Sequence, residues 1–342
     1  MKNQPGPIKI FLLENVAVHP QDLVAVAMRQ FGVTRTTVHR HLNRLIRQGA
    51  IIKTGIRRGV RYSLKSARDK NLVFEISPEL QEHKIWMEFL KDDFSNLALN
   101  IRQICDYAFG EIFNNAIDHS EGKHIWVRTR WQPGAAEICI FDDGIGIFRK
   151  IQRALNLTDE RESILHLTKG KFSTDPRRHS GEGIFFTSRV VDRFAIDSFG
   201  LTYHRIRDED WYVQGNDQAG PGTRVRMTIN LNSPLNMKDV FASLTTINEE
   251  DGIPSFDKTH IWVQLSKLEE ETLISRSQAK RILSGLEKFR HVVLDFRDVP
   301  FIGQGFVDEV FRVYAEKHPE IRIEWTNAND DVRFMIERGI PR

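Results

Sequence analysis

A carboxylate and an amide stand one helical turn apart beside a stretch of sequence that must be buried. Apolar and small residues recur at helical spacing along this stretch: Ile101, Ile104, Cys105, Ala108, Ile112 and Ala116. Glu111 and Asn115 lie at the edge of that stripe. Because desolvating a carboxylate or an amide costs free energy, a helix that keeps both groups there needs something beside it to compensate the cost.

Three glycine motifs follow this helix. The strand "AEICIF" runs into "DDGIGI", in which an Asp-Gly pair alone is typical of a hairpin turn. Gly181 and Gly183 precede a predicted helix, where backbone amides and the helix dipole can hold phosphate, although a lone Gly-x-Gly is a weak signal. Gly222 and Thr223 open an alternating strand. Each motif is ambiguous alone, so their order decides the interpretation.

In sequence, E-x-x-x-N on a helix, D-x-G-x-G after a strand, G-x-G before a helix and G-T at a strand start resemble the GHKL ATPases. This superfamily includes gyrase, histidine kinases and MutL, and the resemblance covers residues 72–235. It implies an ATP pocket between helices and one face of a mixed sheet. It also implies that Asn115 ligates Mg²⁺ through its amide oxygen, that Glu111 polarises the attacking nucleophile and that Asp142 accepts a hydrogen bond from the adenine amino group.

The same resemblance implies roles for the smaller residues. The implied nucleotide-binding residues are Gly144 and Gly146, where any Cβ would intrude on the nucleotide, Gly181 and Gly183 on the phosphate side, and Thr223 near the base. We expect Asp118 to contact the residues that bind the ligand and not the ligand itself. His119 is expected to be structural, and Asn114 to face away from Asn115 as polar surface.

Residues 148–180 resemble the ATP lid of that superfamily, with Gly170 as a flexible point. Lys169, Lys171, Arg177 and Arg178 would then neutralise phosphates as the lid closes, and we expect Lys171 to bind the nucleotide. Which of the four cations does so stays open at this point.

The first 70 residues carry a strong positive charge, with 14 Lys or Arg against 3 Asp or Glu, whereas the whole chain has a net charge of only +3. Helices are predicted over residues 7–18 and 20–31, and a third begins after Thr34, a plausible N-cap. "AIIKT" and "VRYSL" then alternate like two strands joined by the basic tip "GIRRG". A segment of this charge is suited to a polyanion.

This order of elements resembles a winged helix-turn-helix, and "VTRTTVHRHLNRLIRQGAI" resembles the recognition helix of many bacterial regulators. The resemblance implies contacts to double-stranded DNA, with RNA as a variant. Base-edge contacts would come from Arg35, Thr36, Thr37 and Arg40, and phosphate contacts from Arg44, Arg57, Arg58 and Arg61. The alternative is a winged helix that binds protein, with its arginines solvated.

From about residue 238, strands alternate with helices, which predicts a small α/β layer domain. We expect a strand over residues 259–265, a single amphipathic helix over 275–289, and a helix over 305–318. "VVLDFRDVPFIGQGFVDEVF" resembles the STAS fold of anti-sigma antagonists, but residues 292–311 contain no hydroxyl side chain where switching STAS domains carry their phosphoacceptor. We therefore expect an interaction or dimerisation surface.

The sequence thus predicts a multidomain α+β protein. Its parts would be a winged helix-turn-helix (1–68), a GHKL α/β sandwich (72–235) and a small α/β STAS-like layer domain (238–342). No apolar run reaches membrane-spanning length, and the two cysteines have no metal-ligand spacing. We expect a cytoplasmic protein, without membrane partners, that forms a homodimer.

Three classes of function remain open. The first is an ATP-gated DNA-binding regulator, with slow Mg²⁺-dependent ATP hydrolysis. The second is a protein kinase of histidine-kinase-like or anti-sigma-like type, which would phosphorylate a separate partner. The third is an ATP-binding scaffold without turnover, which Glu111 argues against because a pocket that only binds ATP needs no base there.

Overall fold

The computed structural model describes residues 7–48, 50–56, 59–64, 68–132, 134–172, 181–207, 209–214, 220–247, 254–267 and 271–340. The chain divides into two compact units. One comprises Met1–Asn71 with Arg128–Glu137, and the other comprises Leu72–Val127 with Ile138–Arg342. No helix among the described residues is both long enough and apolar enough to cross a membrane.

Among its described residues, the N-terminal unit contains three helices followed by an antiparallel pair of strands. The elements are α1 (Pro7–Asn15), α2 (Leu23–Phe31), α3 (Arg35–Arg47), β1 (Ile51–Thr54) and β2 (Arg61–Leu64). Thr34 caps α3 as predicted, since its hydroxyl accepts a hydrogen bond from the Thr37 amide at 3.3 Å. The first two helices are shorter than predicted, because α1 ends at Asn15 and α2 begins at Leu23.

The core of this unit explains which face of α3 is exposed. Val38, Leu42 and Leu45 are buried against apolar residues of the other elements. Arg40, Asn43 and Arg44, which lie between them along the helix, are exposed.

A seven-stranded sheet, most of which belongs to the second unit, forms the frame of that unit. In spatial order its strands are β3 (Lys70–Glu75), β4 (His124–Gln132), β5 (Ala135–Asp142), β9 (Arg224–Asn230), β6 (Arg193–Ser198), β7 (Leu201–Ile206) and β8 (Glu209–Gln214). β5 and β9 are neighbours although about eighty residues separate them, so the end of β5 lies beside the start of β9.

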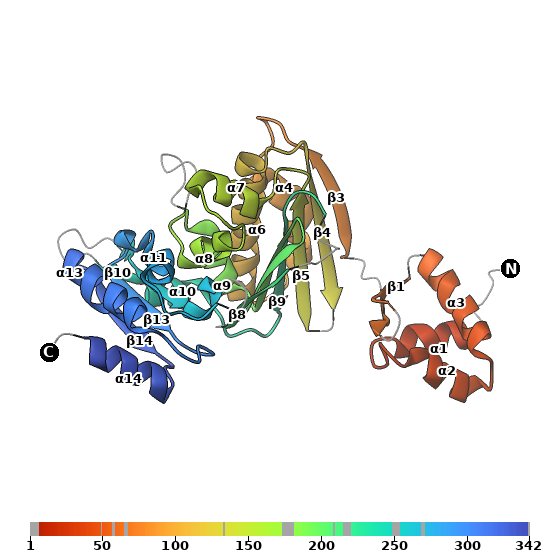
Figure 1. Cartoon of the computed structure of the whole chain (residues 1–342). Coiled ribbons are helices and arrows are strands. Elements are labelled where there is room, and N and C mark those ends of the chain that lie inside the picture. The colour runs from red at the N-terminus through yellow and green to blue at the C-terminus, as the bar shows by residue number, and fades with distance from the viewer. Residues whose placement is uncertain are drawn as a thin grey trace. The chain divides into compact units, whose positions relative to one another are not determined.

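Helices cover one face of this sheet, with α6 and α9 packed against each other and against its strands (Figure 1). The helical segments are α4 (Glu82–Ile85), η2 (Trp86–Leu90), α5 (Lys91–Phe94), α6 (Leu99–His119), α7 (Ile147–Leu155), α8 (Glu162–Lys169), α9 (Gly183–Val190) and α10 (Met237–Leu244). The predicted apolar stripe of α6 is buried at all six positions. Aromatic contacts such as Trp86–Phe109, 5.4 Å between ring centroids, hold α6 against the preceding helices.

The C-terminal domain consists of a short hairpin, a parallel sheet and covering helices. The strands are β10 (Thr245–Ile247) paired with β11 (Pro254–Phe256), then β12 (Lys258–Trp262), β13 (His291–Asp295) and β14 (Arg322–Thr326) in one parallel sheet. The helical segments are η3 (Val263–Ser266), α11 (Arg276–Leu283), η4 (Leu286–Lys288), α12 (Gln304–Val307), η5 (Asp308–Tyr314), α13 (Ala315–Lys317) and α14 (Asp330–Gly339).

Two element predictions in this domain were wrong at their ends. The strand predicted over 259–265 ends at Trp262 and continues as the 3₁₀-helical η3. The helix predicted over 275–289 ends at Leu283, because Gly285 takes a left-handed conformation with φ of 80° and starts the short turn η4. The apolar residues of this amphipathic segment are nevertheless buried: Ala279, Ile282, Leu283, Leu286 and Phe289.

The core of the C-terminal domain extends into α8 and α9 of the sheet domain. Leu165, Phe185 and Phe186, from α8 and α9, belong to the same buried cluster as Phe256 and Ile261 of the C-terminal domain. The predicted boundary near residue 236 therefore separates two folds along the chain, but the hydrophobic packing of the C-terminal domain crosses it.

Candidate functional site

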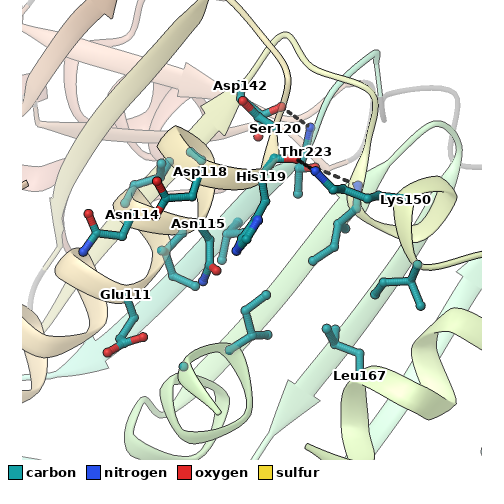
Figure 2. A pocket seen from close by; sticks show the side chains of 18 of the residues that line it. Glu111, Asn114, Asn115, Asp118, His119, Ser120, Asp142, Lys150, Leu167 and Thr223 are labelled. Atoms are coloured by element: carbon teal, nitrogen blue, oxygen red, sulfur yellow. Dashed lines mark hydrogen bonds between the residues drawn. The ribbon is translucent and has the colours of Figure 1, made fainter. Parts of the chain in front are cut away.

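A cavity of about 450 Å³ lies where α6, α7, α8 and the start of α9 meet the ends of β5 and β9 (Figure 2). It is lined by Glu111, Ile112, Asn114, Asn115, Ala116, Asp118, His119, Ser120, Ile140, Asp142, Gly146, Ile147, Lys150, Ile151, Leu167, Phe172, Gly181, Gly183, Ile184, Phe185, Thr223 and Val225. The four motifs found in the sequence therefore converge on one cavity of the size typical for small ligands.

The α6 wall carries the polar residues of the first motif. Glu111 and Asn115 both line the cavity, one turn apart on the same face of the helix (Figure 2). Gly183, the first residue of α9, lies directly opposite Glu111, since a Cβ atom added to it would overlap the Oε2 atom of the carboxylate. The N-terminal end of α9, where free backbone amides favour anions, therefore lies next to the Glu111 carboxylate.

Asp142 ends β5 at the other side of the cavity and is only 6% exposed. Its Oδ1 atom accepts hydrogen bonds from the amides of Gly144, at 2.9 Å, and Thr223, at 3.2 Å. Burial raises the pKa of Asp142 to about 6; the two amide hydrogen bonds oppose this increase and the charge of Asp143 adds to it. Both of these hydrogen bonds reach Oδ1, and we expect Oδ2 to be the oxygen that meets a ligand.

Thr223 ties the two strand ends to α7. Its hydroxyl accepts a hydrogen bond from the Ile147 amide at 2.9 Å, and its carbonyl accepts one from the Asp142 amide at 2.9 Å. The residue predicted to lie near the base thus borders the cavity and also fixes the position of Asp142 relative to α7.

The glycines of the second motif are needed for protein contacts. A Cβ at Gly144 would overlap the carbonyl of Ser120, and at Gly146, whose φ is 85°, it would lie 2.5 Å from the Ser198 hydroxyl. Only Gly146 of the two lines the cavity. Glycine at these two positions is therefore required by contacts within the protein, in addition to the close approach to a nucleotide that we expected.

Several cavity residues were not assigned to the site from the sequence. Lys150 borders the cavity, and its Nζ atom donates hydrogen bonds to the His119 carbonyl at 2.8 Å and to Glu121 Oε1 at 3.1 Å. Its position one turn after Gly146, on the same face of α7 as Ile147 and Ile151, was the available signal. Asn114 also lines the cavity, so the prediction that it is merely surface was wrong.

The predicted lid lysines contact a different part of the chain. The Nζ atom of Lys169 donates to the carbonyls of Arg281 and Ser284, and that of Lys171 donates to the carbonyl of Lys288. Neither lysine is among the cavity-lining residues, whereas Leu167 and Phe172 on either side of them are. Arg177 and Arg178 lie outside the described residues.

The predicted nucleic-acid residues lie in the N-terminal unit. Arg35, Thr36, Arg40 and Arg44 are exposed on α3, and Arg61 is exposed on β2. Thr37 is half-buried and its hydroxyl lies 3.1 Å from that of Thr34, so part of its polar capacity is used in capping α3. Arg57 and Arg58 lie outside the described residues.

Comparison with known families identifies two parts of the chain. Residues 102–233 match the model of the histidine kinase-, DNA gyrase B-, and HSP90-like ATPase, and residues 278–333 match that of a STAS-like domain of unknown function. No curated protein matched the sequence. The chain therefore contains a GHKL-type ATPase domain followed by a STAS-like domain, as the sequence motifs predicted, whereas the winged helix and its DNA contacts stay predictions.

The cavity residues fit a nucleotide that brings its own cation. Among the described residues there is no cluster of three or more His, Cys, Asp or Glu side chains able to hold a metal ion. Mg²⁺ commonly takes only one or two protein ligands and completes its shell with phosphate oxygens and water. The Asn115 amide oxygen, which borders the cavity one helical turn from Glu111, suits a cation held in this way.

Proposed function

We propose that this chain, with its GHKL-type ATPase domain and STAS-like domain, is a nucleotide-controlled regulator that binds ATP with Mg²⁺, hydrolyses it slowly and binds double-stranded DNA. The observation that carries the nucleotide part is the convergence of Glu111, Asn115, Asp142, Gly183 and Thr223 on one cavity. The family match supports ATP binding independently of that geometry.

The residues divide the work of binding. Asp142 accepts a hydrogen bond from the adenine amino group through the oxygen that faces away from the Gly144 and Thr223 amides. Asn115 supplies an amide oxygen to Mg²⁺, which neutralises charge on the triphosphate when bound. The amides at the start of α9, from Gly183 onward, bind phosphate oxygens.

Glu111 acts as the general base. Its carboxylate accepts a proton from a water molecule while the water oxygen bonds to the terminal phosphorus and the bond from phosphorus to the bridging oxygen breaks. The products are ADP and inorganic phosphate. Gly183 leaves the space that the Glu111 carboxylate occupies, so the base and the phosphate-binding amides lie side by side.

The DNA-binding part rests on the charge and exposure of the N-terminal unit. Arg35, Arg40 and Arg44 project from the exposed face of α3, which suits major-groove and phosphate contacts. Nucleotide can control this reader only if it binds two states of the protein with different affinity. A homodimer and a protein partner bound through residues 238–342 belong to the same proposal.

The test combines turnover with binding. We expect wild type to hydrolyse Mg-ATP, Glu111→Ala to bind Mg-ATP without turnover, and Asn115→Ala to lose binding of the Mg-nucleotide complex. Duplex binding should be salt-dependent and should change between apo and Mg-ATP conditions. Turnover unchanged in Glu111→Ala would contradict the catalytic role, and DNA affinity and oligomeric state both unaffected by saturating ATP would contradict the gating.

A protein kinase is the second candidate, since the matched family includes histidine kinases and Glu111 would activate a hydroxyl as well as it activates water. Residues 292–311 offer no hydroxyl, so the acceptor would be a separate protein. Transfer of radiolabelled phosphate from ATP to such a partner, abolished in Glu111→Ala, would favour this function over hydrolysis. Tight ATP binding without turnover or transfer would leave a scaffold.

A further inference from the structure

The segment at the end of α8 contacts both the nucleotide cavity and the C-terminal domain. Leu167 and Phe172 line the cavity. Of the four residues between them, Lys169, Gly170 and Lys171 contact the C-terminal domain. The position of this wall of the cavity is therefore set by contacts that lie outside the ATPase domain.

Lys169 is the most deeply buried of these contacts, at 2% exposed. Its Nζ atom donates to the carbonyls of Arg281, at 3.2 Å, and Ser284, at 2.8 Å, at the C-terminal end of α11, where the helix dipole favours a cation. Its own carbonyl accepts a hydrogen bond from the Thr259 hydroxyl at 2.8 Å. Both the side chain and the backbone of this residue are thus fixed to the C-terminal domain.

Burying a charged amine costs desolvation free energy, and the lowered pKa of Lys169 reflects that cost. Burial lowers the pKa of Lys169 to about 7, and the carboxylates of Glu287 and Glu162 oppose this decrease. A hydrophobic residue would fill the same space without this cost. The lysine therefore provides directional bonds that an apolar side chain would not.

The next two residues extend the attachment. Lys171 donates to the Lys288 carbonyl at 2.9 Å, and Lys288 donates back to the Lys171 carbonyl at 3.1 Å. Lys171 has a φ of 55°, a left-handed conformation that non-glycine residues adopt only when their surroundings require it. A Cβ at Gly170 would lie 2.9 Å from the rings of Phe185 and Phe256.

Aromatic packing joins the opposite side of the same wall to the C-terminal domain. Phe185 lines the cavity and also packs against Phe256, with 4.7 Å between ring centroids. Phe186 stacks on Phe241 at 4.0 Å and contacts Phe256 at 4.9 Å. A movement of α8 or α9 that reshapes the cavity must therefore disturb packing in the C-terminal domain.

We propose that Lys169 is a positioning residue for the nucleotide site: its bonds to the C-terminal domain hold α8 and residues 170–172 where they form one wall of the cavity. The STAS-like domain is then an internal support that sets how tightly the site holds its ligand. The inference rests on the proposed ATP binding. By thermodynamic linkage, the free energy by which this contact strengthens nucleotide binding equals the free energy by which bound nucleotide stabilises the contact at residues 281–289.

The test uses near-isosteric variants on both sides of the contact, in the full chain. Lys169→Met removes the ammonium, and Thr259→Val removes the hydroxyl that bonds to the Lys169 carbonyl. Lys280→Met, on the exposed face of α11 at 67% side-chain exposure, is the matched control. We expect Lys169→Met to weaken Mg-ATP binding at least about tenfold in calorimetry and Thr259→Val at least about threefold. In turnover, KM should rise while kcat changes less than about threefold.

The outcomes separate this inference from the proposed function. Wild type that fails to bind Mg-ATP overturns the proposed function and the inference with it. Wild-type binding together with affinities within about twofold in both variants, each shown to be folded by circular dichroism, overturns the inference alone. If Lys169→Met does not fold, amide hydrogen exchange in wild type decides: Mg-ATP should slow exchange at residues 281–289, and unchanged exchange there overturns the inference.

Discussion

Replacing Gly183 by alanine tests the position of the Glu111 carboxylate with a single added methyl group. The new Cβ would overlap Glu111 Oε2 and lie 3.0 Å from Cδ, whereas non-bonded carbon atoms normally approach to about 3.5–4.0 Å. The carboxyl carbon must therefore move by roughly 0.5–1 Å, and Oε2, which the new Cβ would overlap, by about 1 Å or more. A displacement of about 1 Å in a reacting group costs up to roughly 10²-fold in rate.

The fold should tolerate this change. The displaced atoms are the end of a flexible side chain, and alanine exceeds glycine in helix propensity by up to about 1 kcal/mol. We therefore expect the free energy of unfolding to stay within about 1 kcal/mol of wild type, and Mg-ATP affinity to stay within about threefold, because the α9 amides remain in place. The kcat for ATP hydrolysis should fall roughly 10- to 100-fold, which corresponds to about 1.4–2.7 kcal/mol of barrier.

The assay compares kcat, calorimetric Mg-ATP affinity and urea unfolding in wild type, Gly183→Ala and Gly110→Ala. Gly110 precedes Glu111 in α6, and a Cβ added there meets only Glu82 Cγ, at 4.0 Å. This control adds the same atom to the same part of the fold without displacing the carboxylate. A folded Gly183→Ala variant with the kcat of wild type would refute Glu111 as the positioned base.

Three further outcomes are expected. Burial raises the pKa of Asp142 to about 6, so lowering the pH from about 7 to about 5 protonates this carboxylate and should weaken ATP binding. The same change should make the apo protein more resistant to urea, because the folded state takes up this proton at a higher pH than the unfolded chain does. Asp142→Asn should remove both trends, and apo stability that falls in step with ATP affinity and persists in Asp142→Asn would contradict this assignment. Gly144→Ala should destabilise the fold by about 2 kcal/mol or more in urea unfolding, because its Cβ would overlap the backbone carbonyl of Ser120, which cannot move aside as a side chain can; unchanged stability would show that the turn is looser than described. Arg44→Ala, at a position expected to contact phosphate, should weaken duplex binding and reduce the slope of log affinity against log salt by about 1, whereas Lys280→Ala should leave the slope unchanged; equal slopes in all three proteins would remove Arg44 from the interface.

Periodicity in the sequence was sufficient to predict the framework of the site. The six-residue stripe of α6 is buried as its helical spacing required, and Thr34 caps α3 through its hydroxyl. Glu111 and Asn115 were assigned from local spacing on one helix, which the fold preserves as long as the helix forms. Local rules therefore fixed the residues that share an element with their neighbours.

The lid lysines show where local rules stop. Near a phosphate-binding motif, a lysine is predicted to seek phosphate, yet Lys169 and Lys171 bond to carbonyls more than a hundred residues away in the chain. Nothing within the segment around Gly170 encodes that partner, because the acceptors come from the C-terminal end of α11 and the turn after it. The contact exists only once the two domains have packed.

The packing of the C-terminal domain against α8 and α9 makes it unlike a domain that is attached only by a linker. A domain attached by a linker could bind a partner without affecting the ATPase site, because few contacts would carry the change. Here Phe256 contacts both Phe185 and Phe186, and Phe185 also lines the nucleotide cavity. A partner that shifts the C-terminal domain against α8 and α9 must repack this aromatic cluster, and the cavity wall moves with it. We therefore expect a partner that binds this domain to change the shape of the nucleotide site as well.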